Sequence, residues 1–66
     1  MIGRQQLTVR ENQVRELLLI GNSNKELSDK LRITQRTAQF HASNVLRKVG
    51  VATRIELLAR ALALRR

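Results

Sequence analysis

The sequence predicts an all-α fold, a four-helix bundle with a short helix, a tight turn and a longer helix at its centre. Two observations lead to this prediction. The 66 residues include no proline and only three glycines, so few positions oppose a helix. Three segments open with Ser or Thr followed three residues later by Glu, the capping-box pattern that begins a helix. We expect one domain over residues 1–66.

Capping residues place the ends of each helix in turn. The boxes are Thr8 with Glu11, Ser23 with Glu26 and Thr53 with Glu56, and Thr34 caps the third helix. Gly21 and Gly50 supply left-handed residues that end the first and third helices, and Arg32-Ile33 forms a tight turn. The expected helices therefore span about 9–20, 24–31, 35–49 and 54–64. The second and third, with their turn, have the arrangement of a helix-turn-helix.

Apolar residues at helical spacing predict the core. On the helix over 35–49 they form one arc, Ala38, His41, Val45 and Val49, with Thr37 and Ala42 at its margins. The preceding helices and the turn add Val14, Leu17, Leu18, Leu27, Leu31 and Ile33. His41 lies on the core arc with no second metal ligand or nucleophile beside it. We therefore expect a packed, hydrogen-bonded core histidine, no catalytic residue and no metal site.

The charge distribution indicates a polyanionic partner. Thirteen Lys and Arg residues against five Asp and Glu give a formal net charge of +8. No acidic residue lies between Asp29 and Glu56, and this acid-free stretch holds six cations: Lys30, Arg32, Arg36, Arg47, Lys48 and Arg54. Phe40 is the single aromatic residue, which argues against the stacking surfaces of single-strand binders. Duplex DNA is the expected partner.

Size and composition argue against other classes of protein. A chain this short buries only about 60% of its unfolded surface, so we expect no substrate cleft, no enzyme and no cofactor. The absence of cysteine excludes disulfides and zinc–thiolate sites. The longest apolar run, Leu17 to Ile20, is too short to cross a bilayer, and no signal-like segment is present. These features predict a cytoplasmic protein.

The arc of residues 35–49 opposite the core is polar apart from one ring. Gln39 can form a bidentate pair with adenine in the major groove. Arg36 or Arg47 can pair with guanine or bind a phosphate, and the sequence leaves that choice open. Phe40 has two interpretations of equal weight. Its ring contacts a thymine methyl, or it is tucked against a neighbouring helix.

The helix over 54–64 carries two apolar stripes. One consists of Ile55, Leu58, Ala59 and Leu62, and the other of Leu57, Ala61 and Leu64. One stripe can complete the core, and we assign Leu57, Ala61 and Leu64 to a homodimer interface. An alternative is a protein-interaction module that uses this helix to bind another regulator without DNA contact. A cationic membrane-surface helix is a further alternative, against which the spread of charge around the helix argues.

Motifs along the chain match one family. They are Leu7-Thr8-x-Arg10-Glu11 with Val14 and Leu17; Gly21-x-Ser23-Asn24-Lys25-Glu26-Leu27; Ile33-Thr34-x-x-Thr37-x-x-x-His41; and Asn44-Val45-Leu46-x-Lys48-Val49-Gly50-Val51 with Arg54. At these spacings the chain resembles the LuxR/GerE-type helix-turn-helix domain, found at the C-terminus of many bacterial response regulators and quorum-sensing activators. The resemblance extends from Leu7 to about Leu62.

This resemblance implies a bacterial transcription regulator that binds double-stranded promoter DNA sequence-specifically, with helix 35–49 in the major groove and helix 54–64 in a homodimer interface. By position, the base-reading residues would be Gln39, Phe40 and Ser43. Phosphate contacts would fall to Asn24, Lys25, Thr34, Thr37, Arg47 and Lys48, and the charge pattern adds Arg36. The resemblance also implies a cytoplasmic protein that is nucleoid-associated when bound. A receiver or ligand-binding domain, absent from this chain, usually controls such domains.

Overall fold

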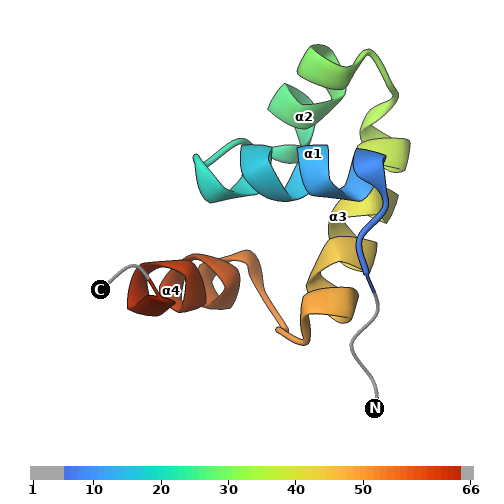
Figure 1. Cartoon of the computed structure of the whole chain (residues 1–66). Coiled ribbons are helices and arrows are strands. Elements are labelled where there is room, and N and C mark those ends of the chain that lie inside the picture. Colours follow the sequence, from blue (N-terminus) through green and yellow to red (C-terminus); the bar gives the residue numbers. More distant parts are fainter. Residues whose placement is uncertain (1–5, 65–66) are drawn as a thin grey trace.

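The computed structural model describes residues 6–64, which form four helices and no strand (Figure 1). They are α1 (Val9–Leu19), α2 (Asn24–Leu31), α3 (Gln35–Val49) and α4 (Arg54–Leu64). The predicted fold class is confirmed, and so are the helix boundaries to within one residue. Both ends of the expected domain, residues 1–5 and 65–66, lie outside the described residues.

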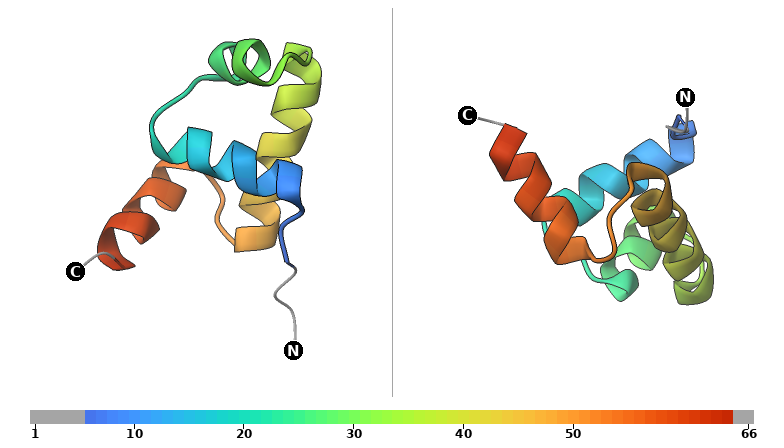
Figure 2. Two further views of the ribbon diagram at one scale, coloured as in Figure 1. Left: turned by 45° about the horizontal axis from the view of Figure 1, so that its top comes forward. Right: turned by 90° about the horizontal axis from the view of Figure 1, so that it is seen from below.

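The helices pack around α1 and α3, which cross each other. In Figure 1, α1 runs across the molecule, with α2 above it and α4 below it. Both α1 and α2 pack extensively on α3, whereas α4 makes smaller contacts with α1 and α3. Figure 2 shows that α4 diverges from the other helices toward its C-terminal end. One face of α3 therefore carries most of the packing.

Side-chain caps account for the starts of the first two helices. The Glu11 N–H donates to Thr8 Oγ1 at 3.1 Å, while the Thr8 N–H donates to Glu11 Oε1 at 2.9 Å. The same reciprocal pair of bonds joins Ser23 and Glu26, at 3.2 and 2.7 Å. Each box satisfies two backbone donors at a helix end. Both predicted capping boxes are confirmed.

The starts of α3 and α4 use simpler caps. The Thr37 N–H donates to Thr34 Oγ1 at 3.0 Å, as expected for a capping threonine. At α4 the Glu56 N–H donates to Thr53 Oγ1 at 3.1 Å, but the Glu56 carboxylate accepts from the Ala52 N–H at 2.9 Å. The predicted third box is therefore half formed, because Glu56 bonds the amide one residue before Thr53.

Three residues with positive φ end the first three helices. Gly21 (φ 93°) and Gly50 (φ 91°) take the left-handed conformation that glycine adopts without a steric penalty. Arg32, after α2, has φ 57° and ψ 48° and is the one such residue other than glycine in residues 6–64. Its turn is closed by the Ile33 N–H, which donates to the Ser28 carbonyl at 3.0 Å.

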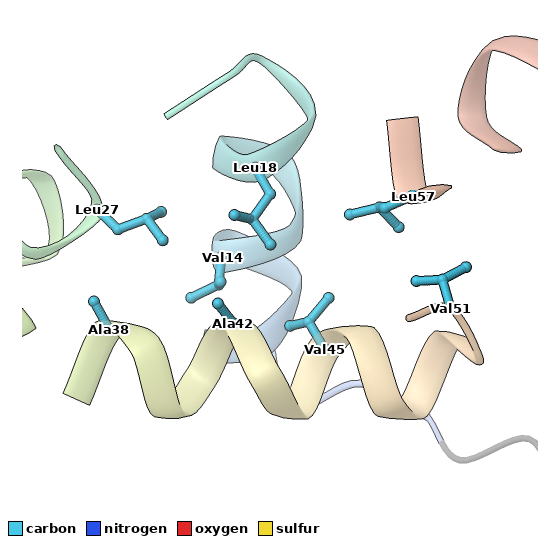
Figure 3. Packing of buried hydrophobic residues seen from close by; sticks show 8 residues of the cluster. All are labelled: Val14, Leu18, Leu27, Ala38, Ala42, Val45, Val51 and Leu57. Carbon is cyan, nitrogen blue, oxygen red and sulfur yellow. The ribbon is translucent and has the colours of Figure 1, made fainter. Parts of the chain in front are cut away.

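The core consists of small and branched apolar side chains that meet over α3 (Figure 3). Its buried members are Val14, Leu18, Leu27, Ala38, Ala42, Val45, Val51 and Leu57. The predicted core arc of α3 needs one correction, because Ala42 is buried whereas Thr37 is exposed and His41 is half-buried. The helix is thus rotated so that its two alanines face α1 and α2, where the short side chains let the backbones approach.

None of the helices formed by residues 6–64 has the length and apolar character needed to cross a membrane.

Candidate nucleic-acid interface

The face of α3 opposite the core is exposed and carries the residues predicted to contact DNA. The exposed side chains are Arg36, Thr37, Gln39, Phe40, Ser43 and Arg47, and the capping residue Thr34 is exposed at the end of the same helix. All three predicted base-reading residues, Gln39, Phe40 and Ser43, are among them. The core packing of α3 leaves amide, hydroxyl and guanidinium groups on one accessible surface, which we call the α3 face.

Phe40 stands on the α3 face with 63% of its surface exposed. Its ring lies 5.9 Å from the ring of His41, centroid to centroid, with the two planes tilted by 59°. At this exposure no helix of residues 6–64 buries the ring, so the interpretation in which it is tucked against a neighbouring helix is wrong. The expectation of a core position for His41 is also wrong, because this side chain is half-buried beside Phe40 and makes no hydrogen bond within residues 6–64.

Polar contacts along α3 and at its cap orient three of the predicted phosphate-binding groups. The Arg47 guanidinium donates to Asn44 Oδ1 at 3.0 Å, which holds the long side chain against its own helix. The Thr34 hydroxyl donates to Thr37 Oγ1 at 3.0 Å. Both threonines remain exposed at the N-terminal end of α3. Ordered side chains lose less conformational entropy when they bind a ligand.

Lys25, at the start of α2, is another exposed candidate for phosphate binding. Its ammonium lies 3.3 Å from Asp29 Oδ2, and both side chains are mostly in solvent. Such surface pairs contribute little to stability, and either partner can exchange for another ion at small cost. The pair therefore leaves Lys25 available to an external anion.

Two other predicted phosphate-binding residues are held in contacts within the protein. Asn24 is half-buried, and its side-chain oxygen accepts from the Arg54 guanidinium, which also donates to the Asn22 carbonyl at 3.0 Å. Lys48 Nζ lies 2.8 Å from Glu11 Oε1. The side chains of Lys48 and Glu11 are only 17% and 8% exposed. The hydrogen bond from Lys48 is the main cause that lowers the pKa of Glu11 below its ordinary value of 4.5.

These contacts divide the six cations of the acid-free stretch into two groups. Lys48 and Arg54 are bonded inside the fold. The other four are exposed on the end of α2, the turn and the α3 face: Lys30, Arg32, Arg36 and Arg47. Within the acid-free stretch, the exposed positive charge therefore lies on the helix-turn-helix itself.

The structure corrects the assignment of one residue in the two stripes of α4. Leu57, predicted in a dimer interface, is 4% exposed and lies in the core. Ala61 is half-buried, and Leu64 is largely exposed. Together with Leu19 and Val49 they line a cavity of about 150 Å³ where α4 meets α1 and α3. In the other stripe Leu58 is half-buried, whereas Ile55 and Leu62 are 78% and 68% exposed. Both stripes are apolar, so only the docking of α4 decides which one faces inward.

Comparison with known proteins agrees with this geometry. The model of the bacterial regulatory proteins of the luxR family matches residues 5–61. The chain belongs to the luxR family. Its relatives in that family include the transcriptional regulatory protein MctR of Rhizobium johnstonii, 40% identical over 60 residues. The transcriptional regulatory protein UhpA of Salmonella typhimurium is 42% identical over 59 residues, and the spore germination protein GerE of Bacillus subtilis is 41% identical over 56 residues.

These luxR-family relatives differ in length. The alignments cover 91% of this chain for MctR and 88% for UhpA, but only 28% and 30% of those two proteins. For GerE, 79% of this chain and 76% of the relative are aligned. The chain thus spans under a third of the first two regulators and about three quarters of the third.

Sequence reasoning missed several residues of the helix-turn-helix framework. Asn22 is buried, and its side-chain amide donates to the Leu17 carbonyl at 2.9 Å, while its own carbonyl accepts from Arg54. The Lys48–Glu11 pair joins residues 37 positions apart. The only local signal was Glu11 in its capping box, which gives no hint of a second partner.

Proposed function

We propose that this chain binds duplex promoter DNA sequence-specifically, with α3 in the major groove, as a bacterial transcription regulator. Membership of the luxR family supports the general role in DNA-binding regulation. The observation that carries the specific proposal is the α3 face, where Gln39, Phe40 and Ser43 are exposed together between Arg36 and Arg47. An α-helix fits the width of the major groove, and these groups match the hydrogen-bonding and methyl groups on base edges.

Each base-reading residue has a chemical role in this proposal. The Gln39 carboxamide donates to and accepts from adenine in a bidentate pair. The Phe40 side chain, 63% exposed within residues 6–64, packs on a thymine methyl. The Ser43 hydroxyl bonds either a donor or an acceptor, so it contributes less discrimination.

Backbone phosphates are bound by the exposed polar groups around these three residues. We assign this role to Lys25, Thr34, Arg36, Thr37 and Arg47. For Asn24 and Lys48 we propose a supporting role instead, because their polar groups already bond Arg54 and Glu11. Phosphate contacts fix the register of the protein on DNA, and base contacts specify the sequence.

We also propose a homodimer formed through α4. The support is a pair of apolar residues on α4, Ile55 and Leu62, which remain 78% and 68% exposed within residues 6–64. In a symmetric dimer, α4 of one protomer would pack on α4 of its partner and bury these residues. The two-fold symmetry would present two α3 helices to two half-sites. Sedimentation velocity on the free protein and on its DNA complex tests the dimer, and a single protomer per DNA site at high concentration would contradict it.

The cellular setting follows from the same proposal. We place the protein in the bacterial cytoplasm, on the nucleoid when it is bound. Because the chain spans under a third of the length of MctR and of UhpA, we propose that a receiver or ligand-binding domain outside this sequence controls it.

Selection from random duplex DNA tests the function. The unaltered protein is expected to enrich one motif, and Gln39→Ala and Phe40→Ala are expected to relax the preference at one or two positions each. Matched controls are Gln13→Ala and Val9→Ala, which remove exposed residues of α1. No enrichment by the unaltered protein would contradict DNA reading. Partner binding that survives neutralisation of Arg36 and Arg47 would instead favour the interaction module.

A further inference from the structure

The turn of the helix-turn-helix holds an arginine where its backbone favours glycine. Arg32 has φ 57°, and its N–H donates to the Ser28 carbonyl, so the left-handed conformation is needed to close α2 and enter α3. For a residue with a Cβ atom this conformation is unfavourable. At Gly21 and Gly50, the other two left-handed positions of residues 6–64, the chain does use glycine.

Nothing in the fold compensates for this cost. Arg32 is exposed, and none of the hydrogen bonds or ion pairs among residues 6–64 involves its guanidinium. Several other arginines are engaged. Arg15 pairs with Glu16, Arg47 bonds Asn44, Arg54 bonds Asn22 and Asn24, and Arg60 bonds the Val49 carbonyl. A strained residue without an internal role suggests that its side chain acts on something outside the protein.

The surroundings of Arg32 identify the chemistry of that partner. It lies two residues before Thr34, the cap of α3, and between the exposed cations Lys30 and Arg36. The nearest acidic residue along the chain, Asp29, is paired with Lys25. The local field is therefore positive, and a guanidinium binds a phosphate through two parallel hydrogen bonds.

We propose that Arg32 binds a backbone phosphate of the duplex at the edge of the groove that receives α3. The proposal rests on the DNA binding proposed above and adds a contact from the turn. In this arrangement the left-handed backbone of Arg32 lowers the stability of the fold, while its side chain raises the affinity for DNA.

The variant Arg32→Gly separates this role from a structural one. Glycine relieves the backbone cost, so Tm is expected to rise by about 2 to 5 °C. Loss of one phosphate contact is expected to weaken DNA binding about tenfold at low salt and to reduce the slope of log affinity against log salt by about 0.9 per protomer. Arg32→Lys, which keeps the charge, should retain most of that slope.

Arg60→Gln provides the matched control, because it removes one exposed cation from α4, away from the turn. It should leave the salt slope unchanged. If Arg32→Gly raises Tm but binds DNA with unaltered affinity and slope, the assignment of Arg32 is overturned while the proposed function stands. An equal loss of slope in Arg60→Gln would show that the slope depends only on net charge. That result would also overturn the assignment of Arg32. Absence of salt-dependent DNA binding by the unaltered protein would overturn both proposals.

Discussion

Lys48 on α3 and Glu11 on α1 form the one ion pair within residues 6–64 that joins two helices, with Nζ 2.8 Å from Oε1. The same carboxylate oxygen also accepts the Thr8 N–H at 2.9 Å. Glu11 thus caps α1 and attaches it to α3 at a mostly buried site. Removal of one partner would leave the other charge without compensation.

We predict that Lys48→Met lowers Tm more than breaking the exposed Lys25–Asp29 pair does. The buried carboxylate of Glu11 loses its partner in the first case, whereas solvent replaces the partner in the second. Thermal unfolding followed by circular dichroism measures both. Asp29→Asn is the control. Equal Tm values for the two variants would show that the Lys48–Glu11 pair stabilises the protein no more than the exposed pair does.

The same pair predicts loss of stability in acid. Because the folded-state pKa of Glu11 lies below its ordinary value of 4.5, its contribution to stability is fully present above pH 4.5 and declines as the pH falls through the folded-state pKa. Urea midpoints measured at a series of pH values from neutral to strongly acidic should show this decline. In Lys48→Met the decline should be smaller, and an identical pH profile would rule out the assignment to this pair.

The two stripes of α4 should respond differently to truncation. Leu57→Ala is expected to lower the free energy of unfolding by about 2 to 5 kcal/mol, because it opens a cavity in the core. Leu62→Ala, which is in solvent in the monomer, should change the free energy of unfolding of the monomer by less than about 0.5 kcal/mol at protein concentrations too low for self-association. Urea denaturation measures both values. Sedimentation should show weaker self-association for Leu62→Ala, and an unchanged dimer would argue against this stripe as the interface.

Gly50→Ala is expected to destabilise the protein by about 1 to 2 kcal/mol, through its backbone alone. A Cβ atom at this position would meet nothing within 4 Å, so no clash contributes. The cost comes from φ 91°, which residues with a Cβ atom rarely adopt. Denaturant unfolding provides the measurement, and a Gly50→Asn variant, which tolerates the left-handed region better, should lose less.

Binding experiments should distinguish the loss of a phosphate contact from the loss of a base contact. Arg36→Gln is expected to weaken binding to all DNA sequences by the same factor. It should also reduce the slope of log affinity against log salt by about 0.9 per protomer, since one counterion fewer is released. Gln39→Ala should leave this slope unchanged and weaken binding to the preferred site only. Fluorescence anisotropy at several salt concentrations distinguishes them, and a sequence-dependent loss for Arg36→Gln would place that residue among the base readers.

The helices could be predicted closely because their ends depend on local chemistry. Thr8, Ser23 and Thr34 cap helices through side-chain bonds to amides three residues away, and glycine marks the left-handed ends. The exposed α3 face followed from the period of a single helix. These features require no knowledge of how the helices pack.

Features that depend on packing between helices could not be predicted from the sequence. Leu57 and Leu62 lie on equally apolar stripes, and only contact with α1 and α3 distinguishes them. Lys48 looks like any surface cation until the fold brings it to Glu11. His41 is half-buried at the margin of the core, whereas Ala38 and Ala42 of the same helix are buried, and the sequence alone does not fix this rotation of α3.

The bonds from Arg54 to Asn22 and Asn24 connect segments 30 or more residues apart in the sequence. The loop before α2 and the first turn of α4 are therefore held by one side chain. In hydrogen exchange, proteins open in cooperative units that are roughly contiguous. Here, neither segment can open fully without the loss of these bonds, so the two are coupled and their amides are expected to exchange at similar rates.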